Sequence, residues 1–221
     1  MLSSLVLTLV RHGQSTANAS EQNPQIEGDF RVPLTALGRE QARAAGHAIG
    51  QPFLKDALVY ASPYLRAQET LAQIFEATGG GDLPAGIFED PRLREVDHGY
   101  ADVKLQECLR ERHGWFYYRY DGGESPADCY DRVSGFLETL MRQVERKGAE
   151  RVLIVTHGLA LRCFVMRFLH MTVAEFETVE NPANGEVVTI APLRLPPNAR
   201  HGPCVYQKGR FGVSGLRFRS G

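Results

Sequence analysis

Long apolar segments and paired cysteine motifs are both absent from this sequence. No apolar run approaches the roughly 20 residues of a membrane helix, and the run near the N-terminus lacks the basic region of a signal peptide. Cys108, Cys129, Cys163 and Cys204 form no Cys-x-x-Cys pair, so we expect reduced thiols. These absences predict a cytoplasmic protein without a membrane partner.

The sequence also lacks an excess of either charge. Its formal net charge is −1 and its pI is about 6.7, which argues against a protein that coats nucleic acid or an anionic membrane. With 221 residues, 43% of them hydrophobic and 23% charged, the chain can form one soluble domain with a substantial core. We expect a single domain over residues 1–221, and a homodimer stays open as an alternative to a monomer.

Acidic residues are missing from one part of the chain, the segment from Val187 to Gly221. The resulting basic C-terminal extension, at about residues 194–221, has two interpretations. It is either a binding arm or a partly ordered extension that packs through apolar residues. We favour packing, through Val205, Tyr206, Leu216 and Phe218.

The most informative stretch runs from Leu5 to Asn18, where an apolar run ends at Arg-His-Gly. A run of Leu and Val without charge is typical of a strand that is covered on both faces. Ligands of open α/β sheets bind beyond the carboxyl ends of the strands. The side chains expected at that edge are Arg11, His12, Gln14, Ser15 and Asn18.

Two later strands end in a similar way. The run from Arg151 to Leu161 ends on His157 and Gly158 and opens a helix, so parallel strands would bring His157 to the edge that carries His12. In the run from Ala57 to Arg66, Ser62 is expected to cap a helix whose first turn holds Arg66. A guanidinium at a helix N-terminus is suited to phosphate binding.

These blocks resemble the motifs of the histidine phosphatase superfamily, the phosphoglycerate-mutase-like proteins. The matching segments, in the family's order, are Leu-Val-Arg-His-Gly-Gln-Ser-Thr-Ala-Asn at 9–18, Ala-Ser-Pro-Tyr-Leu-Arg-Ala-Gln-Glu-Thr at 61–70, Leu-Arg-Glu at 93–95 and Val-Thr-His-Gly at 155–158. The resemblance implies an α/β fold, a three-layer α/β/α sandwich with a mostly parallel central sheet. It also implies a phosphohistidine intermediate, with no metal and no cofactor.

Site roles follow from the same resemblance, position by position. His12 is expected to be the nucleophile and Glu95 the proton donor. Arg11, Arg66 and His157 are expected to hold the phosphoryl group, with Gln14, Ser15, Asn18 and Gly158 near the substrate. We expect His12 to be neutral, with its second ring nitrogen bonded to a backbone carbonyl, and His157 to be protonated.

Residues 89–125 depart from the family pattern. After Glu95 the chain reads Val-Asp-His-Gly-Tyr-Ala-Asp, and a mixture of basic and aromatic residues follows. Such a mixture can bind single-stranded nucleic acid, but acidic neighbours weaken that interpretation. We prefer a capping insert at about 89–125, in which Arg112 and Arg119 face a second anionic group of the substrate. The insert resembles that of an uncharacterised plant and fungal branch of the superfamily.

A metal site is the alternative use of this cluster. Asp97 and His98 could join His12 and His157 as ligands, but the neighbouring arginines would repel a cation. We therefore expect no metal.

Helix signals occur between these blocks. Thr35 is expected to cap a helix that runs to about Ile49, and Ser125 with Asp128 a long helix that ends at Gly148. Thr172 and Glu175 are expected to open a short helix. Strands are expected at 87–88 and 187–191.

The function that these observations favour is hydrolysis of a small phosphorylated metabolite. A phosphoglycerate mutase is the first alternative, although this chain has Glu95-Val-Asp-His-Gly and His157-Gly-Leu159 where the mutases read Glu-Arg-His-Tyr-Gly and His-Gly-Asn. A non-catalytic protein that binds a phosphorylated ligand is the third. We expect a small-molecule phosphomonoester as partner, and no nucleic acid.

Overall fold

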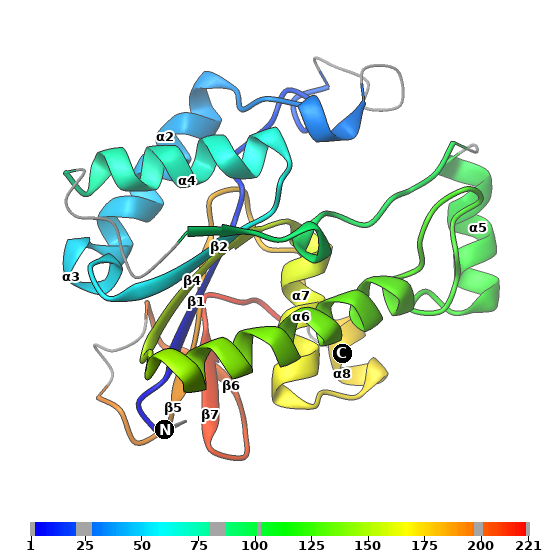
Figure 1. The fold of residues 1–221 in the computed structure, drawn as a ribbon. Helices are drawn as coiled ribbons and strands as arrows, with labels where there is room; N and C mark the ends of the chain where they lie inside the picture. Colours follow the sequence, from blue (N-terminus) through cyan, green and yellow to red (C-terminus); the bar gives the residue numbers. More distant parts are fainter. Residues whose placement is uncertain (1–2, 21–27, 80–86, 101–102, 197–200, 220–221) are drawn as a thin grey trace.

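A computed structural model describes residues 3–20, 28–79, 87–100, 103–196 and 201–219. Its centre is a seven-stranded sheet in the order β3-β2-β4-β1-β5-β7-β6 (Figure 1). The strands are β1 Val6–Arg11, β2 Ala57–Ala61, β3 Ile87–Glu89, β4 Arg151–Thr156, β5 Val187–Pro192, β6 Cys204–Lys208 and β7 Phe211–Ser214. The first four in the order are parallel, whereas β5, β7 and β6 add antiparallel pairs.

Helices cover both faces of this sheet (Figure 1). One face carries α2 Ala36–Ile49, α3 Gln51–Leu54 and α4 Leu65–Ala77. The other carries α6 Pro126–Lys147 and α7 Gly158–Leu169, with α8 Val173–Thr178 beside α7. Short 3₁₀ helices lie at Asp29–Arg31 (η1) and Pro91–Leu93 (η2). The structure confirms the predicted three-layer α/β/α fold with parallel strands at its centre.

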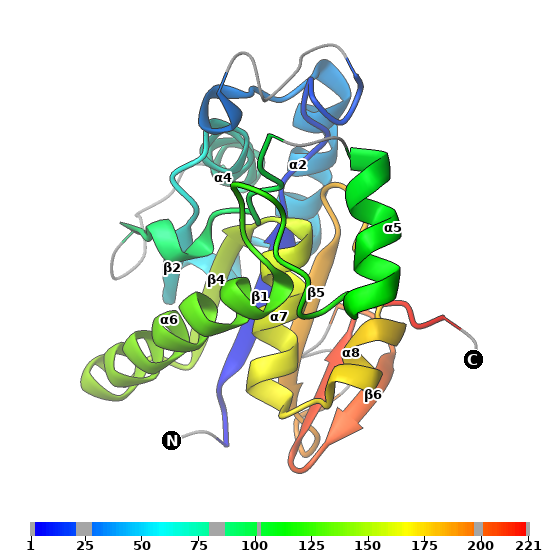
Figure 2. The same ribbon diagram turned by 90° about the vertical axis from the view of Figure 1, so that its right-hand side faces the viewer.

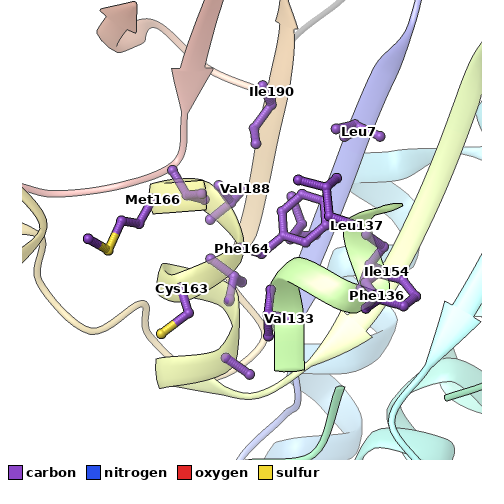
Figure 3. Packing of buried hydrophobic residues seen from close by; sticks show 14 of the residues in the cluster. Leu7, Val133, Phe136, Leu137, Ile154, Cys163, Phe164, Met166, Val188 and Ile190 are labelled. Atoms are coloured by element: carbon purple, nitrogen blue, oxygen red, sulfur yellow. The ribbon is translucent and has the colours of Figure 1, made fainter. Parts of the chain in front are cut away.

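Two apolar cores follow from the alternation of side chains along the buried strands. Leu7 and Ile154 pack with Phe136 and Phe164 of α6 and α7 (Figure 3). Val10 and Val155 point to the other face, where they pack in the core beneath α2 and α4. Because successive strand residues point to opposite faces, an unbroken run of Leu, Val and Ile fills both cores.

Most of the predicted helix ends are confirmed. The Thr35 side chain accepts from the backbone N–H of Gly38, and Ser125 with Asp128 forms the capping box of α6. Thr172 and Glu175 form the corresponding box of α8. The prediction that Ser62 caps a helix is wrong, because α4 begins at Leu65 and its N-cap Tyr64 makes no side-chain cap bond.

The expected capping insert and the basic C-terminal extension have different places in the structure. Residues 89–125 contain α5 Val103–His113, which stands at one side of the molecule, outside the two helical layers (Figures 1 and 2). The basic extension supplies β6 and β7 of the central sheet, a role that its composition did not predict. Residues 197–200 of the extension, and 21–27 of the loop after Asn18, lie outside the described residues. Within the described part of the chain, no helix is long and apolar enough to span a membrane.

Candidate active site

The predicted histidines meet at the carboxyl ends of adjacent strands. β1 pairs with β4 so that Arg11 lies opposite Thr156, and His12 and His157 follow directly. The two imidazole rings have centroids 5.0 Å apart in an edge-to-face arrangement. His12 is 3% exposed and His157 is fully buried. The parallel pairing therefore brings together two residues from distant parts of the sequence.

A close approach of two backbone segments shapes the turn after His12. A Cβ atom at Gly13 would lie 2.1 Å from the carbonyl oxygen of Gly38, and one at Gly38 would lie 2.0 Å from that of Gln14. The Gly13 amide donates to Thr70 Oγ1 at 3.0 Å. Only glycine fits either position, so α2 and α4 hold the turn that carries His12.

His12 is held in a form suited to nucleophilic attack. Its Nδ1 lies 2.7 Å from the carbonyl oxygen of Gly13, so Nδ1 carries the proton and Nε2 keeps its lone pair. Burial, followed by the charge of Arg66, places the pKa of His12 well below its usual value. The ring is neutral at pH 7, as the sequence predicts.

His157 is held differently from His12. Its Nε2 lies 2.8 Å from the Ser62 hydroxyl, whereas its buried Nδ1 has no partner. Burial and the charge of Arg66 hold the pKa of His157 well below its usual value, so the ring is neutral without a ligand, and a protonated ring beside a bound phosphate stays a prediction. With Ser62 donating to Nε2, the Nδ1–H can donate to a ligand.

Arg66 is buried beside the histidines and already has a carboxylate partner. Its Nη1 and Nη2 donate to the Asp29 side chain at 2.9 and 3.2 Å, and Nη1 donates to the Asp29 carbonyl at 2.7 Å. The guanidinium also stacks on the Tyr64 ring. Asp29 thus accepts the two guanidinium hydrogen bonds that the resemblance assigns to phosphate. The sequence pattern did not point to Asp29.

Arg11 is anchored by a loop that the sequence analysis missed. Its Nη1 donates to the Pro182 carbonyl at 2.5 Å, while its buried Nε has no partner. Burial is the main cause that lowers the pKa of Arg11. In the same loop, Asn184 donates to the His12 carbonyl at 3.2 Å and to Asn18 Oδ1 at 3.0 Å. The signal was Asn-Pro-Ala-Asn-Gly at 181–185, which ends one residue before β5.

Glu95 follows η2, and its side chain lies against the first turn of α7, the helix whose N-cap is His157. Its carboxylate accepts from the backbone N–H groups of Leu159 and Ala160, each at 3.3 Å. The preceding residues are fixed by Arg132 of α6, which donates to the carbonyls of Arg92 and Arg94. The charge of Glu95 also acts on Arg11, which places the two in one electrostatic neighbourhood.

The remaining residues of the first motif mostly bond to one another. Ser15 and Asn18 exchange hydrogen bonds between side chain and backbone, each at 3.2 Å. The Gln14 side chain accepts from the Thr35 hydroxyl at 2.9 Å. These contacts order the loop beside His12.

Gly158 and the two arginines of the insert occupy different surroundings. A Cβ atom at Gly158 would lie 2.2 Å from Asn181 Oδ1, so this glycine lets α7 start against the Asn181 loop. Arg119 is exposed and pairs with Asp128 at 2.5 Å, and Arg112 is exposed on α5. The described contacts do not bring Arg112 or Arg119 to the histidines.

The cluster considered for a metal does not assemble. Asp97 and His98 are exposed, and the His98 ring packs against Tyr120 with centroids 4.7 Å apart. Among the described residues, no group of three or more His, Cys, Asp or Glu side chains could hold a metal ion. The geometry around the histidines consists instead of donors for an anion.

Several known proteins are similar to this chain in sequence. The chain is 36% identical to the phosphoglycerate mutase-like protein AT74H of Arabidopsis thaliana, over 81% of this chain and 71% of the relative. It is 26% identical to the broad-range acid phosphatase DET1 of Saccharomyces cerevisiae, over 84% of each. A 2,3-bisphosphoglycerate-dependent phosphoglycerate mutase of Parvibaculum lavamentivorans is 38% identical, over 73% of this chain and 79% of the relative.

Solved structures agree on the fold. A mycobacterial glucosyl-3-phosphoglycerate phosphatase superposes with a TM-score of 0.69 at 24% identity, covering 85% of this chain and 91% of the other. The sequence model of the family described as "histidine phosphatase superfamily (branch 1)" matches residues 7–194 of this chain. With its motif residues gathered at one end of the sheet, the chain belongs to the histidine phosphatase superfamily.

Proposed function

We propose that the protein is a metal-independent phosphomonoester hydrolase that acts on a small phosphorylated metabolite through a phosphohistidine at His12. The observation that carries the proposal is the Nδ1 contact with the Gly13 carbonyl, which leaves Nε2 of a neutral ring as a nucleophile. The yeast relative named as an acid phosphatase supports hydrolysis.

The first step is an in-line displacement. His12 Nε2 attacks phosphorus, a nitrogen–phosphorus bond forms, and the bond to the leaving oxygen breaks. Charge on the equatorial oxygens is stabilised by the Arg11 and Arg66 guanidinium groups and by the free Nδ1–H of His157. Two of these groups have a buried nitrogen without a partner, Arg11 Nε and His157 Nδ1, which supports a role in binding an anion.

Substrate must also displace Asp29 from Arg66. A phosphate dianion offers the same bidentate geometry with more charge, so it can replace the carboxylate. Because Asp29 is more than a third exposed, its carboxylate returns to water at small cost. Asp29 thus holds the Arg66 fork in place until the substrate binds.

Glu95 completes the cycle as acid and then as base. In protonated form it gives its proton to the leaving alkoxide and becomes a carboxylate that the start of α7 stabilises. It then takes a proton from water, whose oxygen attacks phosphorus. The nitrogen–phosphorus bond breaks, which releases inorganic phosphate and restores neutral His12.

A phosphoglycerate mutase is the second candidate, because a mutase is among the relatives at 38% identity. Such an enzyme has to retain the phosphoenzyme and pass its phosphoryl group to a second hydroxyl. The departures after Glu95 and at Leu159 favour the hydrolase.

Covalent labelling tests the nucleophile. Brief incubation with a ³²P-labelled phosphomonoester and an acid-free quench should give an acid-labile, base-stable label on the wild-type protein and none on His12→Ala. His98→Ala is the matched control, because His98 is exposed and its ring packs against Tyr120. A label that persists on His12→Ala would assign the nucleophile to another residue, and label lost to 3-phosphoglycerate more rapidly than to water would favour the mutase.

A further inference from the structure

In the ribbon view α5 lies beside α8 (Figure 2). A cavity is lined by residues of α5, α7 and α8. Its volume is about 770 Å³, within the usual range for small-molecule sites. None of the predicted catalytic residues lines it. The residues that do are Glu107, Arg110, Glu111, Gly114, Trp115, Arg162, Glu177 and Arg219.

Arg162 is the unusual group in this cavity. It is only 7% exposed, its guanidinium stacks on Trp115 and Phe176, and Nη2 donates to the Phe176 carbonyl at 3.2 Å. Its Nε is buried without a partner, and no described carboxylate lies within ion-pair distance. A buried charge without a counter-ion is costly, so an anion in the cavity would be strongly favoured.

Two further arginines, Arg110 and Arg219, add positive charge to the cavity. The Arg110 guanidinium lies over the rings of Trp115 and Tyr120, and its buried Nε also lacks a hydrogen-bond partner. Burial and the nearby charge of Arg219 lower the pKa of Arg162 to about 10, so the group keeps its charge at neutral pH. The inner end of the cavity is therefore cationic with an aromatic wall.

Carboxylates line the outer part of the same cavity. Glu107 and Glu111 lie on the face of α5 that carries Arg110, and Glu177 lies on α8. All three are exposed, whereas Arg162 is buried. Carboxylates accept hydrogen bonds from hydroxyl groups, so a ligand with an acidic group and hydroxyls would satisfy both ends.

We propose that this cavity is a second binding site, separate from the histidine pair, for a small organic anion that carries hydroxyl groups. Its acidic group lies between the Arg162 and Arg110 guanidinium groups, its carbon skeleton lies against Trp115, and its hydroxyls point to the glutamates. A phosphorylated and a carboxylated ligand share this chemistry.

The chain offers a direct reporter, because Trp115 is its single tryptophan and lies in the cavity wall. Titration with inorganic phosphate, and separately with glycerate, should change the Trp115 emission in a saturable manner. Arg162→Gln and Arg110→Gln should each weaken binding by at least about tenfold, because each removes a charged donor. The glycerate arm distinguishes a carboxylate ligand from phosphate.

Two matched variants make the test specific. Arg112→Gln removes a charge from the same helix outside the cavity and should leave the titration unchanged. Arg66→Gln disables the phosphate clamp beside His12 and should also leave the Trp115 response in place. Should Arg162→Gln fail to fold by circular dichroism, Arg110→Gln, which is half-buried on α5, decides alone. No saturation in wild type, or a response that survives Arg110→Gln but disappears in Arg66→Gln, would overturn the proposal.

Discussion

At the scale of single residues, hydrogen-bond partners distinguish two histidines that look alike in the sequence. His12 Nδ1 is bound to a carbonyl oxygen, whereas His157 Nε2 is bound to the Ser62 hydroxyl. The first arrangement sets one tautomer and leaves Nε2 nucleophilic, and the second leaves a donor for a ligand. Burial keeps both rings neutral, so each is ready for its proposed role at pH 7.

Glu95 offers a residue-scale prediction, because a general acid matters in proportion to the leaving group's need for a proton. Glu95→Gln should reduce turnover of alkyl phosphates by about 10²–10⁴-fold. Nitrophenyl phosphate is the control substrate, since nitrophenolate leaves without a proton and its burst-phase phosphorylation should fall much less. Equal losses on both substrates would indicate that Glu95 positions the phosphate, and Asp97 would become the next candidate for the acid.

At the scale of elements, most boundaries follow from local chemistry. Thr35, Ser125 and Thr172 cap helices as predicted because each side chain bonds to a backbone N–H three residues on. Ser62 had the same apparent signal, but its hydroxyl bonds to His157, a residue that only the fold brings near. A tertiary contact therefore replaced the expected cap.

The contact between the turn after β1 and the first turn of α2 gives a prediction for that element. Gly38→Ala would press a methyl group against the Gln14 backbone, so we expect a loss of about 1–3 kcal/mol in the free energy of unfolding and reduced activity. Gly135→Ala in α6 is the matched control, because its Cβ would lie 3.8 Å from its nearest neighbour, the end of the Arg92 side chain. Urea denaturation should show that Gly135→Ala is neutral or stabilised by up to about 1 kcal/mol. Equal stability of both variants would contradict the close contact.

At the scale of the whole molecule, parallel pairing gathers cationic and neutral donors at one end of the sheet. Strands β1, β4 and β2 lie side by side and end at His12, His157 and Ser62. The helices that follow β4 and β2 contribute Glu95's partners and Arg66. The result is a cluster of hydrogen-bond donors, two of them guanidinium groups, at the carboxyl end of the sheet, an arrangement suited to an anion.

Metal independence is the prediction that belongs to this scale. Exhaustive treatment with EDTA and 1,10-phenanthroline should leave phosphatase activity unchanged, because two arginines and two neutral histidines supply the charge and donors that a metal would otherwise supply. Activity after chelation, with metal content measured by mass spectrometry, is the readout. Loss on chelation and recovery with a divalent ion would contradict it.

The sequence by itself determined the parallel core and most helix caps, and it predicted that His12 and His157 meet at one edge of the sheet. These features are encoded locally, in apolar runs, capping residues and motifs that end strands. Only the tertiary structure decided that Asp29 pairs with Arg66 and that Asn184 donates to the His12 carbonyl. It also decided that the basic extension forms β6 and β7 and that Arg162 lines a cavity with Arg110. Each of these depends on contacts between residues far apart in the chain, and no periodicity or spacing within one segment records such contacts.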